Sequence, residues 1–123
     1  MKKILLVDDS NTVLMLQRMM LSGPKYTLII ARNGKEGVEK AIAELPDLIF
    51  MDVVMPEMDG FTAVKKIREQ PALKTTPIIM VTTRGEPENV EQGYAAGCNE
   101  YITKPFDSVE LLAKLETYLG GGP

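Results

Sequence analysis

Short apolar runs recur along the chain and are separated by segments with the apolar spacing of helices. The runs carry no polar alternation, which is typical of parallel strands that are buried on both faces. The predicted strands cover residues 4–7, 26–31, 48–51, 78–81 and 101–102, and the predicted helices cover residues 10–22, 34–45, 59–70, 87–96 and 107–119. Because strands and helices alternate, we expect an α/β fold with one parallel sheet, right-handed crossovers and helices on both faces. Five such units fit a doubly wound sheet and are too few for an eight-fold barrel.

Residues that favour helix ends support several of these boundaries. Ser10 is a good N-cap for the first helix, Pro87 suits the first turn of the fourth, and Gly97 suits its end. Asp107 and Glu110 have the spacing of a capping box at the start of the fifth. The helical periodicity also predicts buried faces, which are made by Val38, Ala41, Ile42 and Leu45 in the second helix and by Leu111, Leu112, Leu115 and Leu119 in the fifth.

Composition and charge narrow the class of protein. With 123 residues, 45% of them hydrophobic and 25% charged, the chain fits one globular domain at residues 1–119, followed by a flexible tail at 120–123. The net charge of −3 and the scattered lysines do not favour a nucleic-acid partner. Cys98 has no partner for an internal disulfide, and no stretch approaches the roughly 20 apolar residues of a membrane span. We therefore expect a cytoplasmic protein that does not bind a membrane.

Five polar side chains each lie just past the end of a predicted strand. They are Asp8, Asp9, Asp52, Thr82 and Lys104. Because the carboxyl ends of parallel strands meet at one edge of a sheet, we expect them to gather where open α/β sheets bind ligands. Clustered carboxylates repel one another and call for a cation, and hard oxygen ligands suit Mg²⁺. The sequence therefore predicts a magnesium-dependent phosphoryl site, and the absence of histidine excludes histidine chemistry there.

The position of Asp52 leaves two roles open. An aspartate can accept a phosphoryl group as an acyl phosphate when a metal neutralises the developing charge, or it can serve only as a metal ligand. Thr82 offers a hydroxyl and Lys104 a cation. Beside a metal these two groups suffice for phosphoryl transfer, because that chemistry relies on positioning and charge stabilisation. One of Asp8 and Asp9 could instead merely cap the helix that follows.

The motifs around these residues form a specific combination. They are Asp8-Asp9-Ser10, Asp52 with Met55-Pro56-Glu57-Met58-Asp59-Gly60, Val81-Thr82-Thr83, Ala96-Gly97, and Tyr101-Ile102-Thr103-Lys104-Pro105-Phe106. In order and spacing they resemble the receiver domain of two-component response regulators, of the single-domain chemotaxis-regulator kind, over residues 3–119. The resemblance implies a flavodoxin-like (βα)5 fold with the strand order 2-1-3-4-5. It also implies a signalling switch that is activated by phosphorylation. Such a receiver catalyses its own phosphorylation and dephosphorylation but is not classed as an enzyme.

The resemblance implies a role for each acidic residue. Asp52 would accept the phosphoryl group from a sensor histidine kinase or a phosphotransfer protein. Mg²⁺ would be bound by Asp9, by Asp52 and by the backbone carbonyl of Val54. Asp8 would act mainly through a metal-bound water.

It also implies how the signal leaves the site. Lys104 would pair with a phosphoryl oxygen, and Thr82 would move to hydrogen-bond another. Tyr101 would then swing into the space that Thr82 vacates. This shift would reshape the face built by residues 87–96, the strand at 101–102 and residues 107–119, where a target protein binds.

Two positions near the site vary within the family and tune how long the phosphoryl group survives. Val54 follows Asp52 by two residues, and Arg84 follows Thr82 by two. The Val54 side chain cannot hydrogen-bond an attacking water, so we expect a longer-lived acyl phosphate. Arg84 would compensate by steering charge near the site.

Two other functions compete with the switch. An aspartate-based phosphohydrolase also uses Mg²⁺ and an acyl phosphate, but its nucleophile follows the first strand in an Asp-x-Asp pattern, and here Asp8-Asp9-Ser10 follows that strand with no cap insertion. A degenerate receiver would act as a constitutive interaction module, yet all five site residues are present. No output domain fits within 123 residues, so we expect a monomer that signals by docking, unless the chain is a piece of a longer protein.

Overall fold

The computed structural model describes residues 2–21 and 25–120 and confirms the predicted α/β fold. Strands β1 (Lys2–Val7), β2 (Tyr26–Ala31), β3 (Leu48–Met51), β4 (Ile78–Thr82) and β5 (Glu100–Thr103) form one parallel sheet in the order β2-β1-β3-β4-β5. The helices are α1 (Asn11–Met20), α2 (Gly34–Glu44), α3 (Gly60–Arg68), α4 (Pro87–Ala96) and α5 (Ser108–Leu119), and a short 3-10 helix, η1 (Pro71–Leu73), follows α3. No helix in these residues is long and apolar enough to cross a membrane. Of the predicted tail, residues 121–123 lie outside the described residues.

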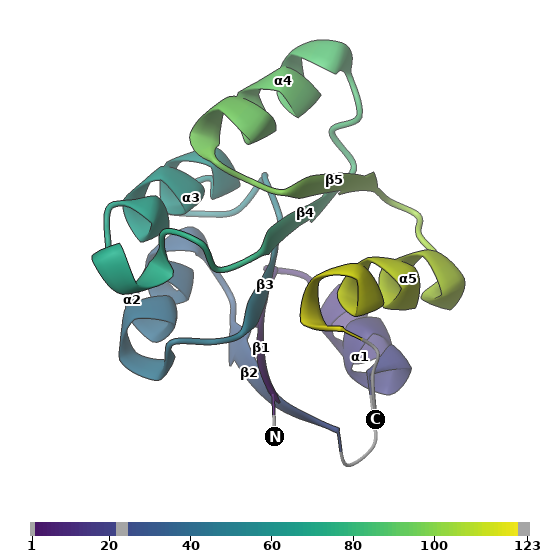
Figure 1. Ribbon diagram of the computed structural model, residues 1–123. Coiled ribbons are helices and arrows are strands. Elements are labelled where there is room, and N and C mark those ends of the chain that lie inside the picture. The colour runs from purple at the N-terminus through teal and green to yellow at the C-terminus, as the bar shows by residue number, and fades with distance from the viewer. Residues whose placement is uncertain (1, 22–24, 121–123) are drawn as a thin grey trace.

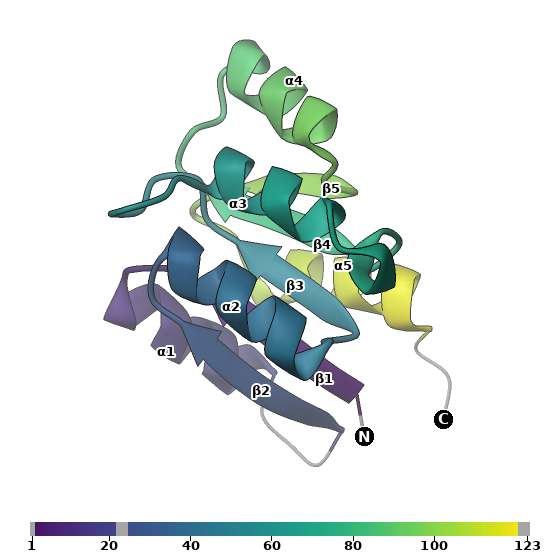
Figure 2. The ribbon, with the colours of Figure 1, turned by 90° about the vertical axis from the view of Figure 1, so that its left-hand side faces the viewer.

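Helices cover both faces of the sheet, as a doubly wound fold requires. Helices α1 and α5 lie on one face, and α2, α3 and α4 lie on the other (Figure 1). Figure 2 turns the second of these faces toward the viewer, so that α1 and α5 lie behind the sheet.

The continuous apolar runs follow from this double coverage. In β1, Leu5 and Val7 point into the core shared with α2 and α3, whereas Ile4 and Leu6 point into the core shared with α1 and α5. Successive side chains of a strand point to opposite faces, so a strand covered on both sides needs an apolar residue at every position.

Most of the predicted helix ends are confirmed. The Ser10 side chain caps α1 and accepts a hydrogen bond from the backbone N–H of Val13. The Asp107 side chain caps α5 in the same way. Pro87 lies in the first turn of α4, and Gly97 ends that helix in the left-handed conformation, with a φ of 118°. That conformation favours glycine, because glycine has no Cβ to collide with the backbone.

The predicted buried faces of α2 and α5 are wrong in part. Ile42, Leu45 and Leu112 are exposed by 44%, 53% and 40%. Helix α2 packs against β1 through small residues, and a Cβ on Gly37 would lie only 2.9 Å from Cγ1 of Val7. Because the two backbones lie so close, the larger side chains of α2 point away from the sheet. In α5 the buried pair is Leu111 and Leu115, and the residue next to Leu111 faces another side of the helix.

Candidate functional site

The strand register brings the five predicted site residues to one edge of the sheet. Val7 pairs with Met51, and Thr82 pairs with Thr103. Asp8, Asp52 and Lys104 are the residues that follow Val7, Met51 and Thr103, so they lie at the carboxyl ends of β1, β3 and β5. This is the edge at which α/β sheets bind ligands.

Three carboxylates form an acidic cluster at this edge. Asp8, Asp9 and Asp52 each offer an oxygen, and these atoms lie within 4.8 Å of one another. Asp8 and Asp52 are buried, with 1% and 6% of their surface exposed, whereas Asp9 is exposed. Asp8 Oδ1 accepts a hydrogen bond of 2.9 Å from the backbone N–H of Ser10, and Asp52 Oδ1 accepts one of 2.8 Å from that of Val53. These bonds fix the orientation of both buried carboxylates.

Lys104 lies against the two buried acids. Its Nζ is 2.8 Å from Asp8 Oδ2 and 3.4 Å from Asp52 Oδ2. The backbone N–H of Lys104 donates to the carbonyl of Thr82, which fixes the residue at the end of β5. Burial raises the pKa of Asp52, the carboxylate of Asp8 raises it further, and Lys104 lowers it. The site thus holds more negative charge than one lysine balances, and a divalent cation would relieve it.

Thr82 and Tyr101 both bond to the backbone of Arg84, in the loop between β4 and α4. Thr82 is fully buried, and its Oγ1 accepts a hydrogen bond of 3.2 Å from the N–H of Arg84. The Tyr101 hydroxyl donates a hydrogen bond of 2.6 Å to the carbonyl of Arg84. Burial raises the pKa of Tyr101 to about 12. One peptide segment therefore connects the two predicted switch residues.

The loop between β3 and α3 holds a tight turn that the motif alone does not predict. The N–H of Met58 donates to the carbonyl of Pro56, and Glu57 between them has a φ of 70°. This is a γ-turn, a strained conformation for a residue with a side chain. The Val54 side chain in the same loop is 49% exposed, so it borders solvent beside Asp52.

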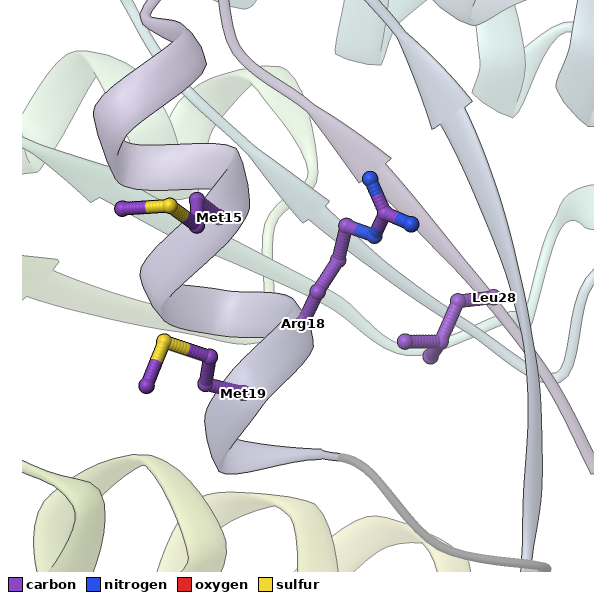
Figure 3. A pocket seen from close by; sticks show the side chains of 4 residues that line it. All are labelled: Met15, Arg18, Met19 and Leu28. Atoms are coloured by element: carbon purple, nitrogen blue, oxygen red, sulfur yellow. The ribbon is translucent and has the colours of Figure 1, made fainter.

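A separate surface hollow lies between α1 and the edge strand β2. Its volume is about 650 Å³, and its lining residues are Met15, Arg18, Met19 and Leu28 (Figure 3). Met15 and Met19 are largely exposed there. None of the five predicted site residues contributes to this hollow, so it takes no part in the chemistry of the acidic cluster.

Arg68 is a positioning residue that the sequence analysis missed. From the end of α3 its guanidinium donates hydrogen bonds to the carbonyls of Leu73, Thr76 and Gly97 and to the side chain of Asn99. Asn99 Oδ1 also accepts a hydrogen bond from the backbone N–H of Ile78, the first residue of β4. These bonds tie together the amino ends of β4 and β5. An arginine near the end of a helix carries no sequence signal for this role, because its partners lie in two separate connections, one between α3 and β4 and one between α4 and β5.

Residues 4–116 match the response regulator receiver domain family. The chain belongs to this family. Receiver domains act as phosphorylation-dependent switches in two-component signalling, and they work with histidine kinases or phosphotransfer proteins and with downstream targets. Because the chain belongs to the receiver family, it is not a member of the aspartate-based phosphohydrolase family.

Individual receiver proteins match nearly the whole chain. The transcriptional regulatory protein ResD of Bacillus subtilis is 41% identical over 95% of the chain, which spans 48% of that relative's length. The chemotaxis protein CheY4 of Vibrio cholerae is 39% identical, with a TM-score of 0.90 over 97% of this chain and 99% of that one. The receiver domain of the sensor histidine kinase PA1611 of Pseudomonas aeruginosa is 32% identical, with a TM-score of 0.90 over 98% of both chains. That structure has a magnesium ion coordinated in its active site cleft.

Proposed function

We propose that residues 1–119 form a receiver domain in which Asp52 accepts a phosphoryl group from a phosphohistidine of a sensor kinase or phosphotransfer protein. The N–P bond of the donor breaks with its electron pair remaining on the imidazole, and an O–P bond to Asp52 forms. The receiver catalyses this transfer and the later hydrolysis itself. The observation that supports this role is that Asp52 is a buried member of the acidic cluster, has a raised pKa and lies within ion-pair distance of Lys104.

The acidic cluster fits a magnesium ion. It presents carboxylate oxygens within 4.8 Å of one another, and these hard ligands suit Mg²⁺. We infer that Asp9, Asp52 and the carbonyl of Val54 bind the ion directly and that Asp8 binds it through water. When bound, Mg²⁺ neutralises charge on the phosphoryl oxygens.

The surrounding side chains supply the remaining electrostatic support. Lys104 already lies 3.4 Å from Asp52 Oδ2 and would pair with an oxygen of the phosphoryl group. Thr82 carries a buried hydroxyl that would donate to another. A phosphoryl group adds nearly two negative charges and three acceptor oxygens, which is enough to draw both donors toward Asp52.

The signal would leave through the face formed by α4, β5 and α5. Thr82 reaches this face through the backbone of Arg84, to which Tyr101 is also bonded. We propose that a downstream protein binds there and distinguishes the two states. Phosphorylation can shift the equilibrium between these two states only by as much as the phosphoryl group interacts more favourably with one state than with the other.

Intact mass spectrometry tests the role of Asp52. We expect a small-molecule phosphodonor to add one phosphoryl group in the presence of Mg²⁺ and none after chelation. The gain should be lost in Asp52→Asn and kept in Asp107→Asn, a matched control in which asparagine can still cap α5. A Mg²⁺-dependent gain that persists in Asp52→Asn would show that another residue accepts the phosphoryl group. If the unmodified protein gains no phosphoryl group, the domain acts as an interaction module that does not depend on phosphorylation.

The Val54→Asn substitution is expected to shorten the lifetime of the acyl phosphate. The valine borders solvent beside Asp52 and cannot orient a water, whereas an amide can. One added hydrogen bond in the hydrolysis transition state is worth about 1.4 kcal/mol, so the loss of phosphoryl mass should be about tenfold faster. Val109→Asn, at an exposed position on α5, is the control and should leave the lifetime unchanged. An unchanged lifetime in Val54→Asn would remove Val54 from the control of hydrolysis.

A further inference from the structure

Gly93 lies inside α4 and is packed against the ring of Tyr101. A Cβ added to Gly93 would lie 2.8 Å from Cδ2 and 2.9 Å from Cε2 of that ring, and 3.2 Å from Sδ of Met80. Real Cβ atoms essentially never approach other atoms within 3.0 Å. Glycine is also the least favourable residue of a helix interior after proline. The close approach of the Tyr101 ring explains why this position is nonetheless a glycine.

The ring is held at its other end by the hydroxyl. It donates a 2.6 Å hydrogen bond to the carbonyl of Arg84, and the N–H of Arg84 donates to Thr82 Oγ1. A contiguous set of contacts therefore runs from Thr82 at the phosphorylation site to the middle of α4.

Helix α4 has few other attachments to the sheet. All of α4 lies in the described part of the chain, and its buried residues are Gly93 and Ala96. Its N-cap, Glu86, makes no capping side-chain hydrogen bond within the described residues. Because α4 buries only Gly93 and Ala96, the ring against Gly93 is a large part of the contact between this helix and β5, while α3 supplies its other neighbour.

We propose that Gly93 is the positioning residue for the Tyr101 ring, and that it sets how readily α4 and the partner-binding face follow the state of Asp52. This inference rests on the proposed function and extends it to a residue that contacts neither the metal site nor the phosphoryl group. A methyl group at position 93 occupies the space of the ring. The ring is half-buried and can rotate toward solvent, which breaks its bond to Arg84 and disconnects α4 from Thr82.

Fluorine NMR of protein labelled with 3-fluorotyrosine tests this role directly. The Tyr101 resonance is assigned by its loss in Tyr101→Phe. In Gly93→Ala we expect it to move toward the shift of free 3-fluorotyrosine and to stop responding when the phosphodonor and Mg²⁺ are added. The neighbouring Gln92→Ala variant changes an exposed side chain of the same helix and should keep the parent resonance and its response. A Tyr101 resonance in Gly93→Ala that keeps the parent shift and still responds to phosphorylation would overturn the proposal.

A double variant tests whether the Tyr101 ring is the group that requires glycine at position 93. In a Tyr101→Leu background the aromatic ring is gone, so Gly93→Ala should raise the melting temperature, whereas in the parent background it should lower it. This reversal of sign is expected because alanine favours a helix once the ring no longer competes for the space. If Gly93→Ala alone fails to fold, recovery of the fold in the double variant supports the proposal, and failure of both overturns it.

The mass gain of each sample is measured in parallel. If the parent protein gains no phosphoryl group, the proposed function fails. The comparison of unphosphorylated Gly93→Ala with its parent still decides whether Gly93 positions the ring.

Discussion

The Lys104→Met variant is expected to bind Mg²⁺ more tightly than the parent protein and to gain its phosphoryl group more slowly. The parent lysine lies 2.8 Å from Asp8 Oδ2 and 3.4 Å from Asp52 Oδ2, so it occupies the acidic cluster as a competing cation. Its removal should increase Mg²⁺ affinity by about tenfold, or about 1.4 kcal/mol. The same removal takes away a cation that stabilises the transferring group, and the loss of one such donor slows a reaction by on the order of 10².

Titration calorimetry measures the affinity, and a time course of intact mass measures the rate. Lys114→Met is the matched control, because Lys114 of α5 forms a 2.8 Å ion pair with Glu100 of β5, away from the cluster. It should change neither quantity. Unchanged Mg²⁺ affinity in Lys104→Met would mean that the ion and the lysine occupy different space, and an unchanged rate would remove Lys104 from the transfer step.

The Gly60→Ala variant is expected to be strongly destabilised. A Cβ on Gly60 would lie 1.9 Å from the backbone oxygen of Asp52, and Gly60 cannot move away because its N–H donates to the carbonyl of Val53. Backbone atoms cannot rotate aside as a flexible side chain can. The free energy of unfolding should fall by about 3 kcal/mol, at the upper end of overpacking effects. A loss of that size lowers the melting temperature of a domain this large by about 10 °C.

Thermal unfolding followed by circular dichroism measures the change, and Gly85→Ala is the control. A Cβ on Gly85 would lie 2.8 Å from Cγ2 of Thr103, so it meets an exposed side chain and not the backbone. The melting temperature of Gly85→Ala should therefore fall much less than that of Gly60→Ala. A Gly60→Ala protein as stable as Gly85→Ala would show that the loop after Asp52 yields easily, contrary to its bonded geometry.

The sheet and the placement of the site could be predicted from the sequence because both depend on strands. The apolar runs are buried on both faces and carry a strong signal, and Asp8, Asp52, Thr82 and Lys104 each follow one of them. The parallel arrangement then brings these residues together whatever the details of the helices. Their roles in the chemistry stay predictions.

The rotation of α1 about its axis could not be predicted. Apolar residues surround this helix, so the sequence pattern does not select one face. In the structure Gln17 is buried with its Oε1 unpaired among the described residues, whereas Met15 and Leu16 are exposed. The γ-turn at Glu57 could not be predicted either. Its φ of 70° is imposed by the surrounding backbone, and glutamate has no preference for that conformation.

We expect the Arg68 hydrogen bonds to make the amino ends of β4 and β5 stiffer than their carboxyl ends. A single guanidinium, whose pKa is lowered by burial, holds the amino ends of β4 and β5 through four separate partners. At the opposite ends of the same strands, the backbone N–H and carbonyl of Arg84 join Thr82 to Tyr101. We therefore expect a displacement at Thr82 to move the carboxyl ends of these two strands and the start of α4 more than the amino ends, which the guanidinium holds in place.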